Sequence, residues 1–142
     1  LIKVAPDLTT SELELIIDTA ITCKIDGIVA TNTTLERPNE TDKIYQEQGG
    51  CSGSPLKSQS TAMIHHIYSY TNGKLPIVGV GGIMNSDDAW EKITAGATLL
   101  QAYAGFVFEG PSLSKSIVNG LHRKLQQSEF DTIADAVGSA HQ

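Results

Sequence analysis

The chain has 142 residues, of which 40% are hydrophobic and 18% are charged, a composition typical of a globular domain. Its formal net charge of −6 argues against nucleic acid as a partner, because no basic face is available to neutralise phosphates. No apolar run is long enough to span a bilayer, and the two cysteines have neither the spacing of a metal site nor the density of a disulfide framework.

The first predicted strand-helix unit lies at the start of the chain. Residues 2–5 form an apolar strand that Pro6 ends, and this opening, without an initiator Met, suggests that the natural N-terminus lies elsewhere. Thr9 and Glu12 have the spacing of a capping box. The apolar residues behind them recur every three or four positions, which predicts an amphipathic helix. Cys23 falls on this helical pattern, and we expect it to be buried.

Two further units are predicted in the middle of the chain. A second strand is expected at residues 27–30, and a long polar stretch at residues 35–54 separates it from a helix that begins at Ser60. The continuous apolar run at residues 76–80 predicts a third strand. The helix after this strand is expected to begin with Ser86 as its N-cap.

The last unit completes a pattern that indicates the fold class. A fourth strand is predicted at residues 98–103, an amphipathic helix follows Gly110, and a short helical tail is expected at about residues 128–142. Alternating apolar strands and helices predict a parallel sheet, either open and doubly wound or closed into a barrel. Glycine and polar clusters after the strands favour a (β/α)8 barrel, which builds its site there. A complete barrel needs about 250 residues, so this chain is expected to form half of one.

Two glycine-containing turns predict a phosphate site. Gly81 and Gly82 follow the third strand directly, where backbone amides can approach an anion and the next helix adds partial positive charge. The segment at residues 101–105 again ends in small residues, one unit later in the chain. Phosphate sites in these barrels are commonly built from the loops after the last two strands. A simple tight turn remains the alternative for the first of these motifs.

Polar residues also follow the first two strands. The segment Thr-Asn-Thr-Thr at residues 31–34 contains Asn32, whose amide donates and accepts and so suits an amide-like or carboxylate ligand, although an Asx turn also fits. Lys3 lies in a predicted parallel strand and needs an anionic partner, either a carboxylate or a ligand, unless the chain end is frayed. His65 and His66 are expected to be surface or packing residues, since no third ligand has metal-site spacing.

Five segments, in this order and spacing, resemble the C-terminal half of the quinone-linked (class 2) dihydroorotate dehydrogenases. They lie at residues 3–8, 29–34, 49–56, 78–83 and 103–111. The similarity extends over essentially the whole chain. One such segment alone would be a weak signal, but five in register make the resemblance strong.

The resemblance implies a flavoprotein oxidoreductase of pyrimidine biosynthesis, with FMN as cofactor, that oxidises dihydroorotate to orotate and passes the electrons to a quinone. It implies a (β/α)8 TIM barrel, of which residues 1–142 form about the last four units. The residues that it assigns to FMN are Lys3, Thr31, Gly53, Gly82, Tyr103 and Ala104. It assigns Asn32 and Thr33 to the substrate and no residue to a metal. In this assignment, the charge of Lys3 stabilises reduced flavin.

Other parts of the family's pattern lie outside this sequence. In the family, the serine base and the N-terminal helices that contact membrane and quinone precede the matching segment. The resemblance therefore assigns no base to this chain and implies that it is inactive alone, with the N-terminal half-barrel or a second copy as its partner. It also implies a peripheral location on the cytoplasmic face of the inner membrane, if the source is bacterial. Cys51 departs from the Leu found more often at its position.

Two alternatives remain open at this point. One is a different FMN- or phosphate-binding barrel oxidoreductase, which would share the glycine turns. The other is a non-catalytic half-barrel that binds phosphate ligands or assembles with itself, because half a barrel exposes two sheet edges and its inner face.

Overall fold

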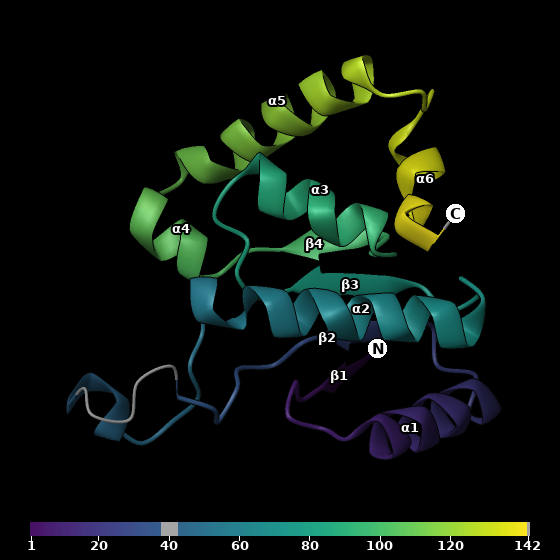
Figure 1. Cartoon of the computed structure of the whole chain (residues 1–142), viewed down its shortest axis with the longest axis vertical. Coiled ribbons are helices and arrows are strands. Elements are labelled where there is room, and N and C mark those ends of the chain that lie inside the picture. The colour runs from purple at the N-terminus through teal and green to yellow at the C-terminus, as the bar shows by residue number, and fades with distance from the viewer. Residues whose placement is uncertain (38–42, 142) are drawn as a thin grey trace.

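The computed structural model describes residues 1–37 and 43–141, so part of the polar stretch predicted at residues 35–54 lies outside the described residues. Four parallel strands form one sheet and pair in chain order (Figure 1). They are β1 (Ile2–Val4), β2 (Ile28–Ala30), β3 (Ile77–Val80) and β4 (Leu99–Gln101). A doubly wound sheet reverses its strand order at a switch point, whereas a barrel keeps the order of the chain. This sheet therefore has the winding of a barrel.

Helices connect the parallel strands and cover one side of the sheet. They are α1 (Thr10–Thr22), α2 (Lys57–Thr71), α3 (Ser86–Thr94), α4 (Ala104–Glu109), α5 (Ser112–Gln127) and α6 (Ile133–Ala136), with 3-10 turns at Lys43–Gln46, Ser54–Leu56 and Ser139–His141. The first three are the crossovers that parallel pairing requires. Figure 1 shows α5 lying along α3, after which the chain returns through α6 towards α3. No helix in the described part of the chain has the length and apolar character needed to cross a bilayer.

The start of α1 confirms the predicted capping box. The Thr9 hydroxyl accepts a hydrogen bond from the Glu12 amide at 3.3 Å, and the Glu12 carboxylate accepts one from the Thr9 amide at 2.9 Å. These bonds occupy two backbone donors that a helix start leaves without intrahelical partners. Behind the cap, Leu13, Ile17 and Ala20 are buried at the spacing of one helix face, as the apolar pattern predicts.

The two faces of the sheet differ in burial. Ile28, Ala30 and Ile77 point towards the helices and are at most 1% exposed. They pack with Ile64 and Ile67 of α2 into the main core, where burying one such side chain contributes about 1.5–3 kcal/mol.

The opposite face carries a different row of residues. Lys3, Val29, Val78 and Leu99 are aligned in register across all four strands. Each of them is half-buried or exposed, and Leu99 is 63% exposed. In a closed barrel this row would point into the interior. The helix-free side of the sheet is thus its inner face.

A second, smaller core joins α3 to α5. Its buried members are Ile83, Ala89, Leu113 and Ile117. A Cβ atom at Gly120 of α5 would collide with the side chain of Ser86, so the absence of a side chain there allows the two helices to approach closely. This contact holds α5 against the start of α3, directly after the Gly81–Gly82 turn.

Several sequence expectations about element boundaries are wrong. The second helix begins at Lys57 rather than Ser60, because a 3-10 turn with Pro55 leads directly into it, and Ser60 is fully buried. The N-cap of α3 is Asn85 rather than Ser86. The Asn85 side-chain oxygen accepts hydrogen bonds from the amides of Asp87 and Asp88 at 2.8 and 3.0 Å.

Two further expectations also need correction. Cys23 is exposed, because α1 ends at Thr22 and Cys23 lies at its C-cap, outside the buried stripe of the helix. The predicted fourth strand at residues 98–103 is shorter and ends at Gln101. The short helix α4 begins at Ala104, where the small residues had indicated only a turn.

Candidate functional site

A pocket lies at the carboxyl ends of the strands, where the loops after all four strands meet. Every residue that the sequence analysis assigned to a ligand lines it: Lys3, Thr31, Asn32, Thr33, Gly53, Gly82, Tyr103 and Ala104. These residues come from five separate segments of the chain. The parallel sheet brings them together because all its strands end at the same edge.

The Gly81–Gly82 turn forms one wall of this pocket in a conformation that requires glycine. Both residues have positive φ, 121° and 72°. A Cβ atom at Gly82 would lie 2.5 Å from Cβ of Lys57 and 2.6 Å from its Cα. Any side chain at this position would therefore push α2 away from the turn. The close packing leaves no room for a side chain, so backbone forms this wall of the pocket, and a wall of glycine backbone fits the phosphate of a ligand.

Residues of the fourth unit form the adjoining wall. Tyr103 is the N-cap of α4, lines the pocket and is 75% exposed. Gly105 is buried against the Ile83 carbonyl, where a Cβ would collide. This contact brings the start of α4 beside the glycine turn. The two segments that the sequence linked to phosphate are therefore neighbours in space.

The segment after β2 continues the sheet into the pocket. The Thr31 amide donates to the Val80 carbonyl at 2.8 Å, and the Asn32 amide donates to the Val4 carbonyl at 2.7 Å. The peptide bond between Ala30 and Thr31 is cis. Thr31 is buried, whereas the side chains of Asn32 and Thr33 are exposed at the pocket wall. The backbone is thus fixed while two polar side chains stay available to a ligand.

Two contacts hold the far end of this segment. Thr34 forms an isolated antiparallel bridge with Cys51, with backbone bonds of 3.1 and 2.7 Å. The Thr34 hydroxyl and the Leu35 amide both donate to the carboxylate of Asp7. Desolvation by itself raises the pKa of Asp7. The hydrogen bonds from Thr34 and Leu35, with one more from Gln59, outweigh this effect and hold the pKa of Asp7 below its ordinary value. Asp7 is a residue that the sequence analysis did not single out.

Lys3 lies on the inner face of β1 and lines the pocket. Among residues 1–37 and 43–141, no ion pair joins Lys3 to a carboxylate. The expectation of an anionic partner is therefore not met by a side chain in this part of the chain. A lysine without a carboxylate beside a pocket is suited to an electron-rich or anionic ligand.

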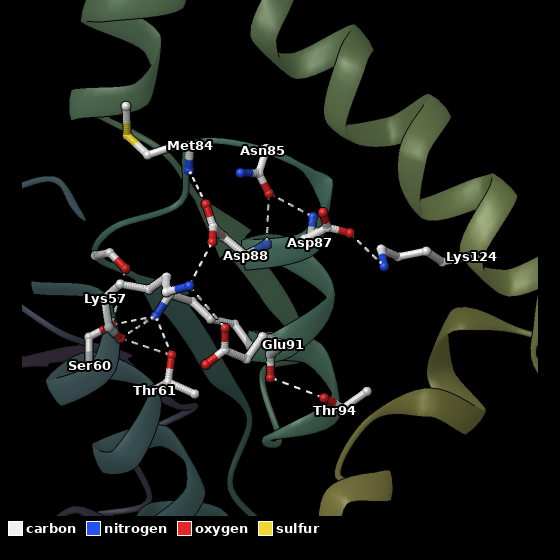
Figure 2. A network of polar contacts seen from close by, with 12 residues as sticks. Lys57, Ser60, Thr61, Met84, Asn85, Asp87, Asp88, Glu91, Thr94 and Lys124 are labelled. Atoms are coloured by element: carbon white, nitrogen blue, oxygen red, sulfur yellow. Dashed lines mark hydrogen bonds and ion pairs between the residues drawn. The ribbon is translucent and has the colours of Figure 1, made fainter.

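A polar network lies directly behind the glycine turn (Figure 2). The Lys57 ammonium is 3.0 Å from the Asp88 carboxylate and 3.4 Å from that of Glu91. The other oxygen of Asp88 accepts from the Met84 amide at 3.0 Å. Asp87 and Asp88 both lie in the first turn of α3, where negative charge favours the helix dipole, and the exposed Asp87 pairs with half-buried Lys124 at 2.6 Å. Asp88, by contrast, is buried and holds the turn to α2 and α3.

Lys92 is fully buried in the same network, a position that sequence reasoning missed. Its ammonium donates to Ser60 Oγ at 2.5 Å, Thr61 Oγ1 at 3.0 Å and the Lys57 carbonyl at 3.4 Å. Burial lowers the pKa of Lys92 to about 8. A signal was present in the sequence, because Lys92 is adjacent to Ile93 and three residues after Ala89, which places it at the edge of the apolar face of α3.

The histidines make packing contacts elsewhere. The ring of His65 stacks on that of His141 with centroids 3.7 Å apart, and His66 is 3.1 Å from the Glu14 carboxylate. Within the described part of the chain, no group of three histidine, cysteine or acidic side chains could hold a metal ion.

Comparison with known proteins gives consistent matches. The family model described as dihydroorotate dehydrogenase matches residues 1–125. A dihydroorotate dehydrogenase (quinone) of Trichodesmium erythraeum is 48% identical over 99% of this chain, and one of Streptomyces avermitilis is 42% identical over 98%. In both cases, the match covers 39% of the relative, so the chain spans about two fifths of the length of these relatives.

Solved structures give the same result for the fold. The ligand-free dihydroorotate dehydrogenase of Eimeria tenella superposes with a TM-score of 0.93 at 37% identity, covering 99% of this chain and 39% of that one. Together with the chain-ordered parallel sheet, this similarity confirms the predicted α/β barrel class, of which the chain forms four consecutive units.

Proposed function

The chain belongs to the dihydroorotate dehydrogenase family, and from this premise we propose that the protein oxidises dihydroorotate to orotate, with FMN as cofactor and a quinone as electron acceptor. One observation carries the proposal to this sequence. The eight residues that the family pattern assigns to FMN and substrate line a single pocket.

The chemistry of the pocket wall fits the phosphate and ring of FMN. The amides of Gly82, Tyr103 and Ala104 would hold the phosphate and the ring edge, since these walls are backbone and close packing against α2 and Ile83 fixes their positions. Gly53, with a φ of 83°, would place its backbone against the flat ring. When bound, FMN supplies an acceptor for the hydride that leaves the substrate.

Lys3 and Thr31 complete the proposed flavin site. The ammonium of Lys3, which no carboxylate among the described residues neutralises, would stabilise negative charge on the reduced ring. Thr31 is buried, and its hydroxyl donates to the Asn32 carbonyl at 2.8 Å, so its remaining lone pairs would face the cofactor.

Asn32 and Thr33 are the proposed substrate ligands. Their side chains are exposed at the pocket wall, while the backbone of Asn32 is fixed to β1. An amide both donates and accepts hydrogen bonds, which matches the alternating donors and acceptors of a pyrimidine ring and its carboxylate. This pairing of polar side chains with the glycine turns favours dihydroorotate oxidation over another reaction of an FMN-binding barrel.

The proposal assigns the remaining parts to residues beyond this sequence. Removal of the C5 proton needs a base on the side of the pyrimidine opposite the flavin, and we place that base, the quinone site and any peripheral contact with a membrane outside these 142 residues. The single-domain half-barrel, with residues 128–142 as its tail, would then pair with the other half of the barrel.

The test uses the protein at its natural length. Heat release followed by mass analysis should identify the cofactor as FMN. Anaerobic addition of dihydroorotate should bleach the flavin absorbance, and a soluble quinone analogue should restore it. A purified protein with a different cofactor, or a flavin that dihydroorotate does not reduce, would refute the proposal. Reduction by a nicotinamide nucleotide alone would favour the alternative oxidoreductase.

A further inference from the structure

Within residues 1–37 and 43–141, no carboxylate forms an ion pair with the buried Lys92 ammonium. Its three hydrogen bonds go to two hydroxyls and one carbonyl, all of them neutral groups. The nearby Asp88 is engaged by the Lys57 ammonium and the Met84 amide. Burying an ammonium destabilises the folded protein unless the surrounding groups or a nearby anion stabilise the positive charge.

One of these hydrogen bonds leads to the wall of the pocket. Ser60 Oγ accepts from Lys92 at 2.5 Å and donates to the Gly81 carbonyl at 3.2 Å. Each hydrogen bond in such a chain polarises the next, so the charge of Lys92 strengthens the hydrogen bond that Ser60 donates to the Gly81 carbonyl. The Gly81 carbonyl and the Gly82 amide belong to one peptide unit, and a trans peptide directs them to opposite sides. The Gly82 N–H therefore points away from Ser60 and is a more strongly polarised donor.

We propose that Lys92 is a positioning residue for phosphate recognition, whose buried positive charge acts through Ser60 and the Gly81–Gly82 peptide to make the turn favour a phosphate dianion. The inference deepens the proposed function and rests on it, because the dianion is that of FMN. The cation itself stays behind the pocket wall. It adds to ligand affinity without touching the ligand.

A purely structural role predicts different behaviour. In that case Lys92 would only tie α3 to α2, and its hydrogen bonds to Ser60 and Thr61 would serve the same purpose. In the proposed role the bond to Ser60 matters for the phosphate and the bond to Thr61 does not, because the Ser60 hydroxyl donates to a carbonyl of the turn whereas the Thr61 hydroxyl donates to the Lys57 carbonyl. Thr61 receives a bond of 3.0 Å from the same ammonium and provides a matched control.

The experiment compares FMN with riboflavin, which lacks the phosphate. Protein of natural length is stripped of cofactor, and both ligands are titrated into wild type and the variants Ser60→Ala, Thr61→Val and Lys92→Met. Lys92→Met and Ser60→Ala should lower the ratio of FMN to riboflavin affinity by about tenfold, the loss expected for a charge-assisted contribution. Thr61→Val should leave this ratio unchanged. If Lys92→Met does not fold, Ser60→Ala against Thr61→Val still decides the matter.

The pH dependence gives an independent readout. Since the pKa of Lys92 is about 8 in the free protein, the affinity ratio of wild type should fall as pH rises above about 8, where the ammonium loses its proton. The charged groups that face Lys92 are Asp88 and Glu91 on α3 and Lys57 on α2. Carboxylates titrate at acid pH, and Asp88 raises the pKa of Lys57, so neither kind of neighbour should titrate near pH 8. In Lys92→Met, the ratio of FMN to riboflavin affinity should not change with pH.

The possible results separate the two proposals. Equal loss of FMN and riboflavin affinity in Ser60→Ala, or an equal effect of Thr61→Val, would overturn the role of Lys92 and leave the proposed function intact. A wild-type protein that binds neither ligand would overturn the proposed function and this inference with it.

Discussion

Asp7 and Thr34 are joined by a hydrogen bond that the threonine hydroxyl donates to the carboxylate, although 27 residues separate them in sequence. The other carboxylate oxygen accepts from the Leu35 amide at 2.9 Å. The loop after β1 therefore anchors the segment after β2, directly beyond the two proposed substrate ligands. The position of those ligands depends on a residue that lines no part of the pocket.

Asp7→Ala should weaken orotate binding much more than FMN binding. The change removes two hydrogen bonds that fix the end of the segment carrying Asn32 and Thr33, and a small displacement of positioned ligands is costly. We expect a rise of about tenfold in the orotate Kd, measured by titration, the equivalent of about 1.4 kcal/mol. Asp26→Ala, at an exposed position, is the control and should have no effect. Parallel losses of both ligands would indicate that Asp7 supports the whole fold instead.

Lys3→Ala should slow reduction of the flavin by dihydroorotate by about 10²-fold or more, because a preorganised charge that acts on the developing negative charge is lost. Stopped-flow absorbance under anaerobic conditions measures this step directly. Lys74→Ala, which removes an exposed lysine far along the chain, is the control, and its flavin should be reduced at the wild-type rate. A normal rate in Lys3→Ala would refute the assignment.

Asn32→Ala should raise the orotate Kd while the protein retains its FMN. Polar groups of a bound ligand that lose their partner cost about 1–3 kcal/mol, which corresponds to a loss of about 5- to 150-fold in affinity. Orotate titration and the flavin content of the purified variant measure the two effects. If both decline together, Asn32 has a structural role and the pyrimidine is bound by other groups.

Asn85→Ala should destabilise the protein by about 1 kcal/mol, the usual value of an N-cap side chain. The Asn85 side-chain oxygen accepts hydrogen bonds from two amides at the start of α3, so the cap does not depend on the neighbouring Ser86 side chain. Ser86→Ala, which keeps the Cβ that meets Gly120, should therefore cost less. Urea unfolding of the two variants beside wild type gives the difference. The reverse order would restore Ser86 as the cap.

A polypeptide of these 142 residues alone should self-associate and show no turnover. β1 and β4 form the two edges of the sheet and have unpaired backbone groups there. Apolar side chains near β4 are also uncovered, with Leu99 63% and Phe106 48% exposed. Size exclusion and a quinone-reduction assay with added FMN test both points. An active 15.1 kDa monomer would contradict them, and an active dimer would mean that a residue of this chain serves as the base.

Except for the short helix α4, the order of strands and helices could be predicted from the sequence, because the apolar residues of each helix recur at helical spacing and each strand ends at a glycine, proline or polar cluster. The capping box at Thr9 and the gathering of the site residues follow from local pattern and from the geometry of parallel sheets. Boundaries were harder where two signals compete. Ser60 has the residue type of a helix start, but the 3-10 turn at Ser54–Leu56 had already begun the helix.

Buried polar residues were the least predictable part of the site. Asp88 and Lys92 have the residue types of a solvated helix face, and although Lys92 lies at the edge of the apolar face of α3, its buried partners come from the packing of α3 on α2. Asp7 was missed for the same reason, because its partners lie in a different unit of the chain. Local sequence gives the types of these residues but not their long-range partners.

The strand order β1-β2-β3-β4 also bears on how the chain folds. Within this sheet each strand pairs only with strands adjacent to it in the chain, so each of these pairings closes over only one strand-helix unit. Short closures lose less chain entropy and give a lower contact order than pairings between distant strands. We therefore expect the units to assemble one upon another in the order in which a ribosome releases them, with β4 joining last.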